Sequence, residues 1–205
     1  MSWDDIYNIM ASGSIFGLFL QVVPITCLVG LIYAVYRCIR IKIKRLSVKL
    51  STEIIRWLFV CYLTGLINLT LVPRGLWGYL WFYVRTGYFD GGFAPLFSGS
   101  FNFVPTLIKV LSGNLTVGSW VRTMLAGNFL MFVPFGFFLP FVSEKINKRN
   151  IWKSAAVIPI VVEVIQPIVG RSFDVDDLIL NFAGIIVGYF LAVGIKALIY
   201  HRTKS

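Results

Sequence analysis

The stretch EVIQPIVGRSFDVDDLILNFAG, residues 163–184, contains the most informative arrangement of polar and apolar residues in the chain. It reads as the end of one apolar helix, a short polar turn and the start of a second apolar helix. Glu163 lies inside the first apolar segment, where burying a carboxylate is expensive. Arg171 and three aspartates crowd the turn. The stretch therefore predicts a helical hairpin that keeps a carboxylate within its apolar part.

The composition of the whole chain explains this setting. Of the 205 residues, 58% are hydrophobic and 14% are charged, and the mean hydropathy is +0.81. A soluble protein of this length needs more polar surface, so the composition predicts an integral membrane protein. The net charge of +10 does not indicate nucleic-acid binding, because the basic residues lie between apolar segments and form no basic face on a soluble domain.

Five apolar segments are long enough, or nearly so, to cross a hydrocarbon core at about 20 residues each. We place them at residues 14–36, 54–72, 122–141, 152–169 and 178–200. The fold class expected is an all-α integral membrane protein forming a single membrane domain over residues 1–205. Residues 1–53 provide the first transmembrane helix and a basic loop, and residues 54–200 form the helical core with an outer loop at 73–121. The acidic start of the chain is unlike the basic start of a secretory signal peptide, so we expect the first span to be retained.

The basic residues predict the orientation. Fourteen of the nineteen Lys and Arg residues fall on the side of the loops at residues 37–56 and 142–153 and of the C-terminal end, which the positive-inside rule assigns to the cytoplasm. The N-terminus is then outside and the C-terminus cytoplasmic. Six of the nine carboxylates fall on the outer side, and the hairpin turn faces outward with them.

Polar side chains from several helices are expected at similar depth below the outer surface. At a rise of about 1.5 Å per residue, Glu163 lies about 12 Å below the turn, and the amides lie about 6–9 Å below their own helix ends. The amides concerned are Asn68, Asn128, Gln166 and Asn181. Packing between helices through hydrogen bonds is one explanation, and a hydrated pocket open to the outside is the other.

The position of Pro167 favours a hydrated pocket over simple packing between helices. It cannot donate a hydrogen bond to the carbonyl of Glu163, so the fourth helix is expected to kink or unwind where its carboxylate lies. Exposed backbone groups at membrane depth are tolerated only against protein or water.

Three features of the hairpin bear on how it packs and what it binds. Asn181, Gly184 and Gly188 form a stripe of small residues that predicts close packing on another helix, with the fourth helix as the expected partner. Either Asp176 or Asp177 is expected to cap the fifth helix. Arg171 is suited either to holding phosphate or to pairing with the aspartates.

The chain resembles the VanZ-like membrane proteins over about residues 54–189. The matching residues are Asn102 with Pro105; Asn128 followed by Phe132, Pro134, Phe135 and Gly136; and Glu163, Gln166, Arg171, Phe173, Asp177, Asn181 and Gly184. The resemblance implies a small multi-pass protein of the bacterial cytoplasmic membrane, associated with resistance to glycopeptide antibiotics such as teicoplanin. The aromatic segment at residues 75–98 is longer than the family pattern. The resemblance therefore does not predict the shape of the outer opening of the pocket.

That aromatic segment lies in the long outer loop. Trp and Tyr favour the membrane interface, so an interfacial helix over residues 76–84 is expected. A re-entrant helix in the same loop is a second possibility. Stacking on sugars or another flat ligand is the alternative.

Several kinds of chemistry are disfavoured. His201 is the only histidine and lies in the C-terminal tail, so neither a Ser-His-Asp triad nor a histidine-bound zinc site is expected on the outer side. The three cysteines lack CxxC spacing and are interpreted as apolar fillers. We expect no metal ion and no cofactor, although Asp174, Asp176 and Asp177 leave a divalent cation open as an alternative to solvation and capping.

What remains is carboxylate chemistry on a lipid-linked substrate. We expect the protein to bind, and leave open whether it modifies, a polyprenyl-linked peptidoglycan precursor in an outer-leaflet pocket. Non-catalytic shielding and lipid flipping or transport are the alternatives, and the apolar inner halves of the helices count against transport. If the protein is an enzyme, Glu163 and Asp177 are the candidate acid and base. The candidate substrate-binding residues are Asn68, Arg74, Asn102, Asn128, Gln166, Arg171 and Asn181.

Overall fold

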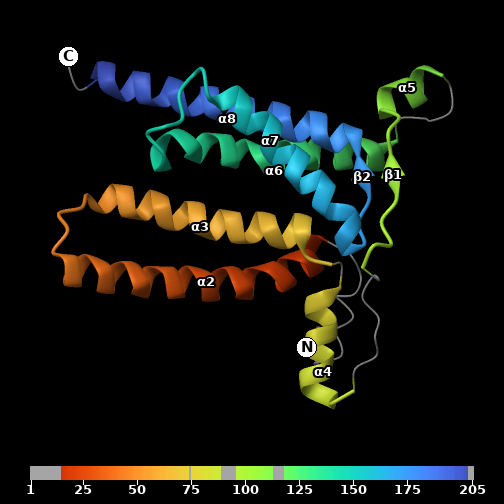
Figure 1. The fold of residues 1–205 in the computed structure, drawn as a ribbon, viewed down its shortest axis with the longest axis horizontal. Helices are drawn as coiled ribbons and strands as arrows, with labels where there is room; N and C mark the ends of the chain where they lie inside the picture. The colour runs from red at the N-terminus through yellow and green to blue at the C-terminus, as the bar shows by residue number, and fades with distance from the viewer. Residues whose placement is uncertain (1–14, 74, 89–95, 113–117, 203–205) are drawn as a thin grey trace. The chain divides into compact units, whose positions relative to one another are not determined.

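The fold is an all-α membrane protein, seen in a computed structural model that describes residues 15–73, 75–88, 96–112 and 118–202 (Figure 1). Within these residues, five helical segments are long and apolar enough to cross a membrane. They are α2 (Ile15–Lys44), α3 (Leu50–Leu71), α6 (Ser119–Val142), α7 (Ile151–Ile165) continued by the 3₁₀ helix η1 (Gln166–Val169), and α8 (Val175–Arg202). The five predicted spans are therefore confirmed, with α2 extending further toward the C-terminus than expected.

The chain divides into two compact units. The first comprises Met1–Ser47, Val60–Ser100 and Ile165–Arg171, and the second comprises Val48–Phe59, Phe101–Val164 and Ser172–Ser205.

In the first unit, α2 packs against the C-terminal part of α3. A Cβ at Gly65 of α3 would lie 3.7 Å from Cγ1 of Val22, which is ordinary van der Waals distance. Helix α4 (Leu76–Thr86) follows α3 and occupies the position expected for a helix in the aromatic segment. Gly75 and Gly87 bound α4 with φ of 81° and 71°, a left-handed conformation that glycine adopts without steric cost.

In the second unit, α6 and α8 lie side by side (Figure 1). A Cβ at Gly136 would overlap the carbonyl oxygen of Ile185, and a Cβ at Gly188 would overlap that of Val133. Gly184 similarly approaches the backbone of Phe129. From Gly184 to Gly188 the contacted residue advances from Phe129 to Val133, so the two helices run parallel.

The small-residue stripe of α8 therefore packs on α6, and the expectation that α7 is its partner is wrong. Close approach of two backbones needs small residues on both helices, and Gly136 of α6 supplies the second small surface. Helix α7 contacts α8 through larger side chains, with the ring of Trp152 6.2 Å from that of Phe182 and 6.5 Å from that of Phe190.

The expected interruption of the fourth span is confirmed. The α-helical part ends at Ile165, and η1 begins at Gln166 with Pro167 in its first turn. Gly170 ends η1 with a φ of 73°. The missing N–H of Pro167 thus coincides with a change of helix type just after Glu163.

A two-stranded parallel ribbon, which the sequence pattern did not predict, precedes α8. Strand β1 (Phe101–Asn102) pairs with β2 (Phe173–Asp174), so that Phe101 faces Phe173 and Asn102 faces Asp174. A short helix, α5 (Thr106–Leu111), follows β1. Two-residue strands carry no periodic pattern, so their pairing depends on contacts between residues far apart in the sequence.

Candidate functional site

The first turn of α8 is the centre of a polar cluster in the second unit. One carboxylate oxygen of Asp174 accepts a hydrogen bond from the backbone N–H of Asp176 at 2.9 Å, which is the interaction of an N-cap residue. Asp174 therefore caps α8, and the expectation that Asp176 or Asp177 does so is wrong. The helix starts at Val175, earlier than expected, which places both of those aspartates inside its first turn.

Two of these aspartates hold the segment around β1. The side-chain N–H of Asn102 donates to the second carboxylate oxygen of Asp174 at 2.8 Å, and Lys109 donates to the amide oxygen of Asn102 at 2.7 Å. Asp176 is buried and accepts the backbone N–H of Thr106 at 2.8 Å, at the start of α5. Two carboxylates from α8 and its preceding strand thus position residues about 70 positions earlier in the chain.

Glu163 joins this cluster from the end of α7. Its side chain is 0% exposed, and Oε2 accepts the backbone N–H of Asp174 at 3.0 Å. The hydrogen bond crosses the turn of the hairpin and links the fourth span to β2. Glu163 therefore points toward protein, and its carboxylate lies among polar groups of the second unit.

A second pair of polar side chains lies between α6 and α8. The amide N–H of Asn128 donates to Oδ1 of Asp177. One turn further along α8, Asn181 is 3% exposed, and its buried side-chain oxygen has no hydrogen-bond partner among the residues that the structure describes. A buried acceptor of this kind is unusual in proteins and suits a donor from a bound molecule or water.

We call the set formed by these side chains the carboxylate–amide cluster. It contains Asn102, Asn128, Glu163, Asp174, Asp176 and Asp177. The sequence predicted four of the six as candidate site residues, and Asp174 and Asp176 were interpreted as capping, solvated or cation-binding groups or as partners of Arg171. No feature near these two aspartates in the sequence distinguishes them, because their partners lie in the segment from Asn102 to Thr106.

The three aspartates do not converge on one point. Asp174, Asp176 and Asp177 accept hydrogen bonds from Asn102, Thr106 and Asn128, respectively. Among the described parts of the chain, no group of three or more His, Cys, Asp or Glu side chains is placed to hold a metal ion.

The remaining candidate residues belong to the first unit. The side-chain oxygen of Asn68 accepts the indole N–H of Trp77 at 2.7 Å, and its amide donates to the carbonyl of Thr64 at 2.8 Å. Arg171 donates through its guanidinium to the carbonyl of Leu69. Gln166 is buried, and its backbone carbonyl accepts the N–H of Arg171 at 2.9 Å. Arg74 lies outside the described residues.

Gly99 brings the outer segment against η1 within the first unit. A Cβ at this position would overlap the carbonyl oxygen of Arg171, and the N–H of Phe97 donates to the carbonyl of Ile168 at 2.9 Å. The segment before β1 thus follows the 3₁₀ turn closely, which explains why glycine is required there.

Chemically, the carboxylate–amide cluster presents hydrogen-bond acceptors and amides on side chains that are partly or fully buried. Carboxylates held in this way can accept a hydroxyl or an amine of a bound molecule, or exchange a proton with it. Some oxygens of Asp174, Asp176 and Asp177 accept hydrogen bonds from other segments of the chain. These oxygens also hold those segments in place.

Comparison with known proteins identifies the family. Neither the curated proteins nor the solved structures contain a significant match to the chain. The family model described as VanZ/LLP1 matches residues 59–199, which include the end of α3 and all of α6 and α7. This match covers more than half of the chain and includes every residue of the carboxylate–amide cluster. Given this match and the five helices, among the described residues, that are long and apolar enough to cross a membrane, the chain is a multi-pass membrane protein of the VanZ/LLP1 family.

Proposed function

We propose that the protein binds a polyprenyl-linked cell-envelope precursor in the bacterial cytoplasmic membrane, and that this binding gives resistance to glycopeptide antibiotics such as teicoplanin. Membership of the VanZ/LLP1 family supports the context, since the resemblance noted above implies an association with such resistance. The precursor combines a long apolar tail with a phosphate-bearing sugar head, so its site needs polar groups at membrane depth.

The observation that carries the proposal is the burial of Glu163 inside a membrane span. A charged side chain at mid-membrane costs roughly 2.5–3.5 kcal/mol on insertion scales, and such residues usually face a bundle interior or a wet cavity and serve function. Asn128 and Asp177 lie in the same unit, and Asn181 presents a buried acceptor there. In this proposal these groups bind hydroxyls and amides of the head group.

A separate proposal concerns phosphate binding in the first unit. The guanidinium of Arg171 donates to the carbonyl of Leu69, and guanidinium groups are well suited to binding phosphate. For the first unit taken by itself, we propose that Arg171 and Arg74 bind phosphate and that Asn68 and Gln166 bind polar groups.

Binding without chemistry is favoured over catalysis by the hydrogen bonds of the cluster. Glu163, Asp174 and Asp176 all accept backbone N–H groups, which is the arrangement of residues that hold a structure in place. We therefore propose shielding of the precursor as the mode of resistance. Enzymatic modification, with Glu163 and Asp177 as acid and base, is the second candidate, and it is favoured by the desolvation of Glu163.

The test is incubation of the purified protein in lipid nanodiscs with polyprenyl-linked envelope precursors, followed by native mass spectrometry. The proposal expects a bound precursor of unchanged mass, and Asn128→Ala should weaken binding because Asp177 loses its amide donor. Glu144→Gln, at an exposed loop position, is the matched control and should bind normally. Detection of a precursor of altered mass would support catalysis and contradict shielding. Absence of binding would contradict both hypotheses.

The same variants are tested in cells for teicoplanin susceptibility. Asn128→Ala should lose protection in proportion to its loss of binding, while Glu144→Gln should retain it. Transport is tested by the movement of a labelled precursor across vesicles that contain the protein, and movement would favour the flippase alternative.

A further inference from the structure

Helix α4 has two chemically different faces. Trp77, Leu80, Trp81 and Val84 follow i, i+3, i+4, i+7 spacing and form an apolar stripe. Tyr79, Tyr83 and Thr86 follow i, i+4, i+7 spacing and carry hydroxyl groups along the opposite face. We call these the apolar face and the hydroxyl face of α4.

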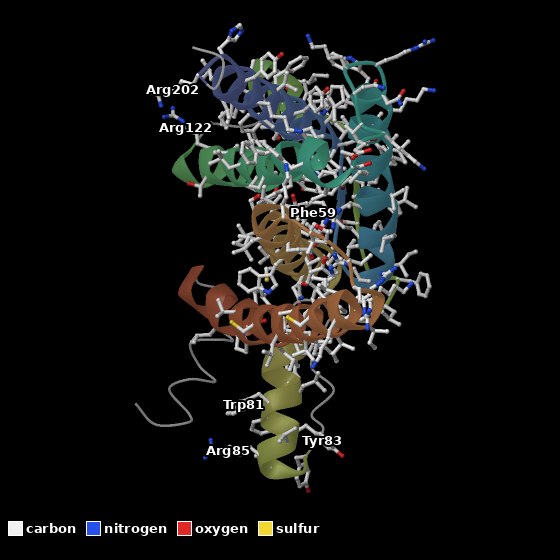
Figure 2. All side chains as sticks on the ribbon, turned by 90° about the vertical axis from the view of Figure 1, so that its left-hand side faces the viewer. Phe59, Trp81, Tyr83, Arg85, Arg122 and Arg202 are labelled. Carbon is white, nitrogen blue, oxygen red and sulfur yellow. The ribbon has the colours of Figure 1, made fainter. Side chains whose placement is uncertain are left out.

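The length and direction of α4 exclude a membrane span. Eleven residues give a helix of about 16 Å, roughly half of a hydrocarbon core. In Figure 1, α4 runs across the direction of α2 and α3, and Figure 2, turned by 90°, shows it running across α2 again. Because α2 is a membrane-spanning helix, a helix that runs across it lies near the plane of the membrane.

One end of α4 is attached to the protein. The indole N–H of Trp77 in its first turn donates to Asn68 in the last turn of α3 at 2.7 Å, and Gly78 is buried. This hydrogen bond sets α4 at the level where α3 leaves the membrane.

Side chains at the other end of α4 are exposed. Trp81 is 38% exposed, Val84 is 79% exposed, and Tyr88, just beyond the helix, is 77% exposed. Figure 2 shows Trp81, Tyr83 and Arg85 projecting outward from the helix. Amphipathic helices rich in Trp and Tyr are stable in the zone between headgroups and acyl chains, where the apolar ring and the polar tip of each side chain are both accommodated.

We propose that α4 is an interfacial helix, which lies in the surface of the lipid leaflet at the end of α3 and places its apolar face about 5–10 Å into the boundary between headgroups and acyl chains. The hydroxyl face is directed toward water and headgroups, and Arg85 contributes a positive charge that suits lipid phosphate. The partner of this surface is the lipid leaflet itself. The inference is independent of the ligand proposed for the carboxylate–amide cluster.

The experiment compares two exposed positions on different faces of α4. Val84→Cys and Thr86→Cys are made separately after Cys27, Cys38 and Cys61 have been replaced by Ala, and each full-length protein is labelled with a fluorophore in phospholipid nanodiscs. Quenchers are placed near the headgroup, near the end of the acyl chain, or in the water. Leu31→Cys, at an exposed position of α2, marks the behaviour of a lipid-facing residue within a span.

The proposal expects the headgroup-level quencher to act on the Val84 label several-fold more strongly than the acyl-end quencher, and the aqueous quencher to act mainly on the Thr86 label. Equal aqueous quenching at both positions would place α4 in water and overturn the proposal. Strong quenching of both labels from the acyl end would show a re-entrant helix and also overturn it.

A second measurement keeps the native cysteines. Trp81→Phe should reduce the quenching of tryptophan fluorescence by brominated lipids, while Trp77→Phe, at the attached end, should reduce it less. If the two substitutions have the same effect, or if neither changes the quenching, α4 does not insert as proposed.

Discussion

Glu163 links the fourth span to the strand before α8 by a hydrogen bond to a backbone N–H. Its amide isostere retains a carbonyl oxygen that can accept the same hydrogen bond, whereas alanine leaves the N–H of Asp174 without this acceptor. The two substitutions therefore separate the geometry of the side chain from its ionisation.

We predict that Glu163→Ala lowers the free energy of unfolding by about 1–3 kcal/mol, the usual cost of leaving a buried hydrogen-bonding group unsatisfied. Glu163→Gln should keep most of the stability. Thermal unfolding of the detergent-solubilised protein, followed by size-exclusion chromatography, measures both, and Glu144→Ala at an exposed loop position is the control. Equal losses for Ala and Gln would show that the charge, and not the hydrogen bond, supports the fold.

The first turn of α8 shows how far individual residues could be assigned from sequence. Glu163 stands out because a carboxylate is unusual inside an apolar segment, and this signal is visible without coordinates. Asp177 stands out only as one of the residues that match the VanZ-like pattern. Asp174 appeared equivalent to its neighbours, yet it caps α8 and holds Asn102. Its role depends on where the helix begins and on a partner 72 positions away, neither of which is encoded nearby.

The backbones of α6 and α8 approach each other closely in the second unit. Gly136 on α6 and Gly184 and Gly188 on α8 permit the approach, and all three would clash with backbone atoms if they carried a Cβ. The stripe on α8 was recognisable from its spacing, but its partner was not. Adjacency in the chain favoured α7, whereas complementary small residues favoured α6.

We predict that Gly188→Ala separates α6 from α8 and lowers the free energy of unfolding by about 1–3 kcal/mol, the typical cost of overpacking. Gly194→Ala is the matched control on the same helix, because a Cβ there meets nothing within 4 Å and alanine favours helix. The melting temperatures of both variants in detergent test this. A melting temperature of Gly188→Ala equal to that of Gly194→Ala would contradict the packing described.

The distribution of charge makes a prediction for the entire protein. The loop between α6 and α7 carries three basic residues, Lys145, Lys148 and Arg149, whereas the segment around β1 carries no Lys or Arg from Leu96 to Ile108. The positive-inside rule therefore places the loop between α6 and α7 in the cytoplasm and the β1 segment outside.

We predict that a membrane-impermeant maleimide labels Val104→Cys in intact cells and labels Lys148→Cys only after the membrane is opened. Both positions are exposed, and the three native cysteines are replaced by Ala beforehand. The reverse pattern would invert the orientation, and labelling of both positions in intact cells would contradict a fold in which α6 crosses the membrane.

Amino-acid order alone was enough to predict a membrane protein with five spans, the ends of the last four spans to within a few residues, and the interruption of the fourth at Pro167. Hydropathy, span length and the missing N–H of proline are local properties, so they can be assessed without knowing what lies nearby. The packing of α8 on α6, the pairing of β1 with β2 and the hydrogen bonds that the aspartates accept from the segment around Asn102 emerged only from the folded arrangement. These contacts join residues about 50–70 positions apart, and they depend on which surfaces fit together once the helices have formed.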